Sequence, residues 1–135
     1  MKNSVVRHVC VALVLFAFAH NVFAGAAAAK LTRIRFAQGA VSATVWGTLY
    51  GQHDVRHYIL RVRAGQHMTV HVTSSKLTNP QIDVTFPSGE HMDRDMQGTQ
   101  FETVSTQPGD YRIDVYEGMK GDPGKGKFKL WVEVI

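Results

Sequence analysis

The chain has 135 residues, of which 44% are hydrophobic, and a formal net charge of +4 at pH 7. This length suits one domain with a sizeable core. The small net charge gives little support to nucleic-acid binding, and a single cysteine excludes an internal disulfide.

The first 24 residues have the features of a secretory signal peptide. A basic start precedes an apolar run at positions 9–19, and Val22-Phe23-Ala24 forms a cleavage pattern. The run is shorter than the roughly 20 residues that a membrane span needs, which disfavours an uncleaved anchor. Cleavage after Ala24 would remove Cys10, two of the fifteen Lys and Arg and no acid, and would lower the net charge to +2.

We therefore expect an exported protein with no membrane segment after cleavage. Residues 25–30 are rich in alanine and are expected to form a flexible spacer. Residues 31–135 are expected to form a single domain.

Almost everything after the spacer alternates between apolar and polar residues with period two, which is typical of half-buried strands. This pattern predicts strands over 31–37, 41–50, 57–63, 67–72, 82–86, 99–104, 111–117 and 127–135. The first two are expected to bury Thr32, Ile34, Phe36, Val41, Ala43, Val45 and Gly47. The later ones are expected to bury Tyr58, Leu60, Val62, Met68, Val70, Val72, Ile82, Val84, Phe86, Tyr111, Ile113, Val115, Phe128, Leu130, Val132 and Val134.

The number of strands and the turns between them predict the fold class. Glycine-containing turns separate the strands, and no stretch has the period of an amphipathic helix. About eight short strands of this kind predict an all-β protein, an antiparallel β-sandwich.

Residues 121–127 read G-x-x-x-x-G-K, close to a phosphate-binding loop. Such a loop needs a helix after it and a Ser or Thr after the Lys. Here Phe128 follows the Lys, and the next residues alternate like a strand. The string is better interpreted as a glycine-rich connection between the last two strands.

Other catalytic and metal patterns are weak. There is no G-x-S-x-G, no catalytic cysteine setting and no obvious pair of carboxylates on neighbouring strands. His67 with His71, and His53 with His57, could each give two metal ligands, whereas a zinc site needs three or four. We expect no enzyme activity, no metal and no cofactor.

Trp46 and Trp131 fall on the outward phase of their strands. They would suit a sugar- or protein-binding platform, or they could pack under a loop or at the edge of the sandwich.

The order of the motifs resembles a known fold family. HYILRVRAGQHMTVHV, IDVTFPSG, TQPGDYRIDVYE and KFKLWVEV follow one another as in the pre-peptidase C-terminal-like sandwich, of jelly-roll type. Within that group the sequence is similar to the periplasmic inhibitors of g-type lysozyme. The shared features are the signal peptide, R-x-R-F-x-x-G at 33–39, the approach to Tyr58 from Gly51, Gly65-Gln66 and Gly109-Asp110-Tyr111.

This resemblance implies a periplasmic protein that blocks the glycan cleft of g-type lysozyme and thereby evades host defence. It implies two binding loops, at 51–56 and 117–127. The implied lysozyme-binding residues are Gln52, His53, Asp54, Arg56, Met119, Lys120, Asp122 and Lys125. The alternative is an envelope glycan-binding module without inhibitory activity, for which peptidoglycan would be the partner.

Overall fold

The computed structural model describes residues 30–77, 79–92, 98–119 and 125–135. The predicted signal peptide and all but the last residue of the spacer lie outside the described residues. The described part of the chain contains no helix that is long and apolar enough to cross a membrane.

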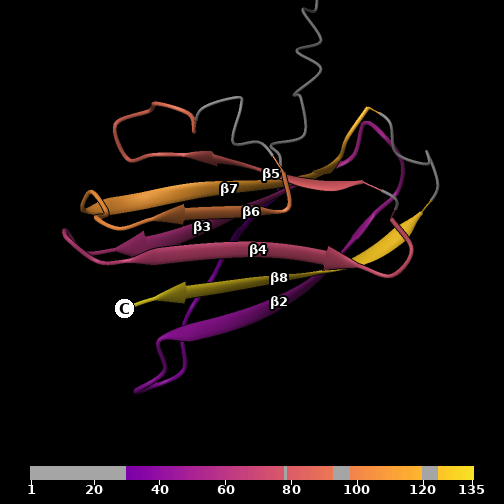
Figure 1. Ribbon diagram of the computed structural model, residues 1–135. Coiled ribbons are helices and arrows are strands. Elements are labelled where there is room, and N and C mark those ends of the chain that lie inside the picture. The colour runs from indigo at the N-terminus through magenta and orange to yellow at the C-terminus, as the bar shows by residue number, and fades with distance from the viewer. Residues whose placement is uncertain (1–29, 78, 93–97, 120–124) are drawn as a thin grey trace, which may run out of the picture.

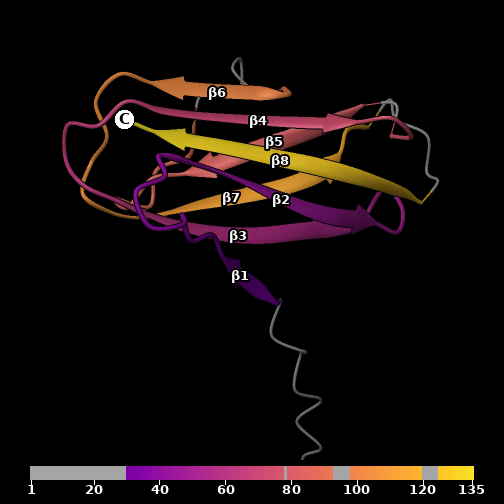
Figure 2. The same ribbon diagram turned by 90° about the horizontal axis from the view of Figure 1, so that it is seen from below.

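Within these described ranges, eight strands form two four-stranded sheets that face one another (Figures 1 and 2). The first sheet has the order β1-β3-β7-β5 and the second has the order β2-β8-β4-β6. The strands are β1 (Leu31–Arg33), β2 (Ser42–Leu49), β3 (Val55–Val62), β4 (Met68–Ser74), β5 (Pro80–Thr85), β6 (Gln100–Thr103), β7 (Gly109–Glu117) and β8 (Gly126–Val134). The predicted all-β sandwich is thus confirmed.

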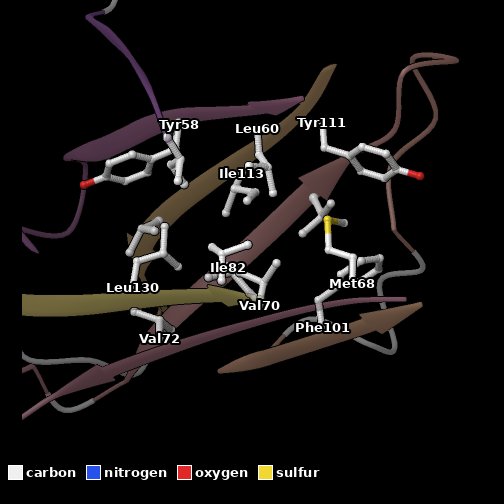
Figure 3. Close-up of a cluster of buried hydrophobic side chains, with 14 of the residues drawn as sticks. Tyr58, Leu60, Met68, Val70, Val72, Ile82, Phe101, Tyr111, Ile113 and Leu130 are labelled. Carbon is white, nitrogen blue, oxygen red and sulfur yellow. The ribbon is translucent and has the colours of Figure 1, made fainter. Parts of the chain in front are cut away.

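The core lies between the sheets, where side chains from both inner faces point toward one another (Figure 3). The period-two alternation buries every second residue of β3, β4, β7 and β8, as predicted. Each large apolar side chain that is fully buried stabilises the fold by roughly 1.5–3 kcal/mol. The most deeply buried ones include Met68, Tyr111, Ile113, Phe128 and Leu130.

The N-terminal region differs from the prediction. β1 has only three residues and pairs with β3 in parallel, whereas we expected antiparallel pairing throughout. Val41, predicted to be buried, is 49% exposed, and Thr32 is also exposed. Ile34 is buried as predicted, and its N–H donates to the carbonyl of Ile59, which continues the pairing beyond the strand.

A side-chain ion pair also links this short strand to β7. The guanidinium of Arg33 donates two hydrogen bonds to Asp110 on β7, with N–O distances of 3.1 and 3.2 Å. These bonds hold the pKa of the Asp110 carboxyl below its ordinary value. The Arg33 side chain therefore connects β1 to β7 across the intervening strand β3.

Strand pairing places three connections at one end of the sandwich, which we call the loop end. Leu49 at the end of β2 lies opposite Gly126 at the start of β8. Val55 at the start of β3 lies opposite Tyr116 near the end of β7. The β2–β3, β4–β5 and β7–β8 connections therefore leave the sheets on the same side, at the end of Figure 1 where β8 begins.

Candidate functional site

The two predicted binding loops are neighbours at the loop end. The side-chain amide of Gln52 donates a 3.1 Å hydrogen bond to the carbonyl of Met119. This bond joins the β2–β3 and β7–β8 connections directly, although the two residues are 67 positions apart. Met119 is 96% exposed and His53 is also exposed, so both are available to a partner.

Tyr50 forms the centre of a cationic cluster between these loops. Its ring is largely exposed, and its centroid lies 4.5 Å from Nζ of Lys125 and 5.5 Å from Cζ of Arg56. Each cation is attracted by the ring's electron-rich face. The pairing of Leu49 with Gly126 places Lys125, which precedes β8, beside Tyr50, which follows β2.

Asp54 and Arg56 brace the β2–β3 connection from within. Oδ2 of Asp54 accepts hydrogen bonds from the backbone N–H of Tyr50 at 2.9 Å and from Nη2 of Arg56 at 3.0 Å. Nε of Arg56 donates to the carbonyl of Thr48 at 2.8 Å. Two N–H donors of Arg56 and one carboxylate oxygen of Asp54 are therefore used inside the loop, which gives it a defined shape.

The β7–β8 connection begins one residue later than predicted. Glu117 is only 3% exposed and belongs to β7, so it is a buried residue and not part of an exposed loop. Its Oε1 accepts the backbone N–H of Asn79 at 2.8 Å, and the N–H of Gly118 donates to the carbonyl of Asn79. Val55 and Arg56 likewise belong to β3 and not to the loop before it.

The structure brings together six of the eight predicted binding residues at the loop end: Gln52, His53, Asp54, Arg56, Met119 and Lys125. Lys120 and Asp122 lie outside the described residues.

Sequence reasoning missed two residues of this region. Tyr50 was considered only for a glycan platform, because nothing in the sequence shows that Lys125 lies above its ring. Glu117 was assigned to the second binding loop, although it falls on the same phase as Tyr111, Ile113 and Val115, and that phase could have identified it as an inward residue.

A shallow groove of about 280 Å³, which we call the edge groove, lies beside the loop end between β2 and the β1–β3 pair. Its lining includes Trp46, Tyr50, Arg56 and Tyr58. Burial raises the pKa of the Tyr58 phenol, and the Arg56 charge offsets part of that rise. Tyr58 therefore remains a neutral hydroxyl at physiological pH.

Trp46 is 73% exposed, so the interpretation that it packs under a loop is wrong. Trp131 is half-buried. Both lie on the outer face of the second sheet, as their phase predicted.

One carboxylate pair does lie on neighbouring strands, contrary to the interpretation of the sequence. The register places Asp83 of β5 directly opposite Asp114 of β7. Oδ2 of Asp83 lies 2.9 Å from Nδ1 of His91. Oδ1 of Asp114 lies 2.7 Å from Nδ1 of His57 and accepts a 2.8 Å hydrogen bond from Arg112. Arg112 thus compensates the charge of Asp114, and His91 is a hydrogen-bond partner of Asp83.

The remaining sequence patterns have clear places in the fold. Strand β8 begins at Gly126, so a strand and not a helix follows the glycine-lysine string. Within the described ranges, no three His, Cys, Asp or Glu side chains form a group that could hold a metal.

Comparison with known proteins identifies the fold. PliG of Aeromonas hydrophila, a periplasmic lysozyme inhibitor of g-type lysozyme, matches with a TM-score of 0.62 and 27% identity, over 78% of this chain and 96% of that chain. PliG of Salmonella Typhimurium, described in the same words, matches with a TM-score of 0.60 and 17% identity, over 78% of this chain and 98% of that one. The pre-peptidase C-terminal domain of a Bacillus anthracis collagenase matches with a TM-score of 0.58 and 18% identity, over 77% and 95% of the two chains.

No family profile matches the sequence, and neither does any curated protein. The chain nevertheless has the sandwich fold of these solved structures and is similar to the periplasmic inhibitors of g-type lysozyme, as the sequence motifs indicated.

Proposed function

We propose that this protein is an exported inhibitor of g-type lysozyme and that it binds the enzyme through its loop end. The observation that carries the proposal is its similarity, at 27% identity, to an inhibitor of that enzyme over nearly the whole of the inhibitor's chain. The relatives named above as inhibitors are periplasmic, which supports the same location for this protein. It would act by binding and would need no catalytic group.

The loop end has suitable chemistry for a glycosidase cleft. Most glycoside hydrolases place two carboxyl groups beside the bond that they cleave. A loop that enters such a cleft needs a cation to compensate those acids. Lys125 is exposed, lies at the loop end and makes no ion pair within the described ranges.

The surrounding contacts favour tight binding. Hydrogen bonds of Asp54 and Arg56 hold the β2–β3 connection in shape, and the Gln52–Met119 hydrogen bond links it to the end of β7, before any partner arrives. Binding then requires less loss of conformational entropy. A charge pair that becomes buried in the complex can couple by about 1.5–7 kcal/mol, whereas an exposed pair contributes about 0.2–1 kcal/mol.

The test is an inhibition assay with charge-reversed variants. Purified protein is titrated into g-type lysozyme during peptidoglycan clearing, with c-type and i-type lysozymes for comparison. We expect the Lys120→Glu, Lys125→Glu double variant to need at least tenfold more protein for half inhibition, which corresponds to about 1.4 kcal/mol of binding energy. Its far-UV circular dichroism melt should remain close to that of the wild type, because Lys125 is exposed.

The matched control reverses two charges away from the loop end. Arg35 and Arg63 are exposed and follow β1 and β3, at the opposite end of the sandwich. The Arg35→Glu, Arg63→Glu variant has the same net charge as the test variant and should inhibit like the wild type. Full inhibition by a folded loop-end variant would reject the assigned site, and no inhibition of g-type lysozyme by the wild type would reject the function.

A further inference from the structure

The outer face of the second sheet carries an exposed aromatic residue outside the loops described above. Trp46 lies on β2 directly opposite Lys129 of β8, and Lys129 is in turn opposite Thr73 of β4. These three strands lie next to one another in the sheet (Figure 1). The indole of Trp46 therefore stands on the outer face of the sheet, with Lys129 as its neighbour on the adjacent strand.

Trp46 forms a wall of a second hollow, which we call the outer groove, of about 420 Å³. The other polar residues that line it are Thr73, Ser74, Ser75, Lys127 and Lys129, and no carboxylate is among them. The hydroxyl of Ser74 donates to the carbonyl of Lys127 at 2.7 Å and accepts the N–H of Leu77 at 2.8 Å. This bonding fixes the corner of the groove where β4 ends.

The two lysines of the outer groove have charges that are not compensated nearby. Over the ranges that the structure describes, neither Lys127 nor Lys129 lies within 4.0 Å of an acid. Trp46 also borders the edge groove, whose cationic lining residues include Lys30 and Arg56 and which again has no carboxylate. The indole is thus a ridge between the outer groove, which has two uncompensated lysines, and the edge groove, where Arg56 is already paired with Asp54 and Lys30 supplies the remaining positive charge.

This combination differs from an ordinary exposed apolar residue. A single exposed tryptophan needs no explanation, but one flanked by grooves with convergent hydrogen-bond donors resembles a ligand site. A sugar ring has an apolar face that can stack on indole and a rim of hydroxyls that can bond to Thr73 and Ser75. Carboxylates on the sugars would be held by the lysines.

We propose that the Trp46 face binds an acidic glycan strand, a polymer of amino sugars that carry carboxylates. The strand would lie across the indole, with successive sugars in the outer groove and the edge groove. Single-stranded nucleic acid also combines rings with negative charges, but the proteins that bind it present several aromatic side chains in a row, on which successive bases stack. One ridge with hydroxyls beside it fits a sugar better.

Binding is tested without lysozyme, so that the result does not depend on the proposed inhibition. The probes are soluble peptidoglycan glycan strands with free lactyl carboxylates, chitohexaose, which has a similar backbone without carboxylates, and an oligothymidylate. Dissociation constants are measured by isothermal titration calorimetry at two salt concentrations. The variants are Trp46→Ala, Trp46→Phe and Lys129→Gln.

The controls make the same kinds of change away from the grooves. Val104→Ala removes an apolar side chain that is 80% exposed, and Arg35→Gln removes an exposed positive charge. All variants should keep the wild-type circular dichroism melt, because each altered side chain is exposed.

We expect the acidic strand to bind, with affinity lowered at least tenfold by Trp46→Ala, less by Trp46→Phe, and about threefold by Lys129→Gln, with a smaller salt dependence in the last case. Chitohexaose should bind more weakly than the acidic strand, and both controls should match the wild type. The proposal is overturned if the acidic strand does not bind, if Trp46→Ala binds as tightly as the wild type, or if chitohexaose or the oligothymidylate binds equally well.

Discussion

Gly47, in the middle of β2, has no room for a side chain. A Cβ built at this position would lie 2.6 Å from Cε1 of Phe128 and 2.8 Å from the hydroxyl of Tyr58. Both neighbours are buried, with exposed fractions of 1% and 5%, and they contact one another edge to face. Neither ring can therefore move away without disturbing the core. We predict that Gly47→Ala destabilises the protein.

Two opposing effects determine how far Gly47→Ala lowers the free energy of unfolding. Overfilling a packed core costs about 1–3 kcal/mol. Replacing a glycine by alanine inside a strand stabilises the protein by about 0.5–1 kcal/mol, because the unfolded chain then has less conformational entropy. The balance is a loss of about 1–2 kcal/mol. For a domain of this size about 1 kcal/mol shifts the melting temperature by roughly 4–8 °C, so we expect a decrease of about 5–15 °C.

The assay is a thermal melt followed by circular dichroism, with Gly98→Ala as the control. A Cβ at Gly98 would meet nothing within 4 Å, and this glycine does not have a positive φ. Gly98→Ala should therefore leave the melting temperature unchanged or raise it slightly. A Gly47→Ala protein that melts at or above the wild-type temperature would refute the packing of β2 against Phe128 and Tyr58.

Three further predictions follow from other contacts. A double-mutant cycle of Tyr50→Ala and Lys125→Ala, measured by urea unfolding, should give a coupling free energy of about 0.5–1 kcal/mol from the exposed cation–π contact, and zero coupling would contradict the cluster. Tyr111→Phe should lower the free energy of unfolding by about 0.5–1.5 kcal/mol, because the phenol oxygen accepts the Gln107 N–H at 2.8 Å; a wild-type urea midpoint would argue against that bond. Burial raises the pKa of Tyr58 above its unfolded value of about 10, so the contribution of the neutral phenol to the free energy of unfolding is complete below pH 10 and is lost at higher pH. The urea midpoint of Tyr58→Phe should therefore decrease less between pH 9 and 11 than that of the wild type. An equal decrease would be inconsistent with this shift of the pKa.

The strands were predictable because most of them bury one face and expose the other. From Met68 to Val72 of β4 and from Tyr111 to Val115 of β7, each inward residue is apolar and each outward residue is polar, so the sequence alone defines the phase. The prediction failed at Val41, which precedes β2 and is exposed, because alternation does not reveal where a strand begins. The parallel pairing of β1 was equally hidden, since alternation gives no information on which strand Leu31–Arg33 pairs with or in which direction.

The site was predictable only in part. Motif resemblance identified the two loops, but the contacts that join them depend on strand register. Lys125 lies above Tyr50 because Leu49 lies opposite Gly126, and Gln52 reaches Met119 because Val55 lies opposite Tyr116. The opposed acids Asp83 and Asp114 were missed for the same reason.

The central claim is that the loop end binds g-type lysozyme, and hydrogen exchange of the complex tests it most directly. Amide exchange is compared for the protein alone and with saturating g-type lysozyme. The account predicts slower exchange at residues 50–56 and 117–127, and unchanged exchange at the turns of residues 63–67 and 104–108, at the opposite end. Protection confined to that opposite end, or no protection anywhere, would contradict binding of g-type lysozyme by the loop end.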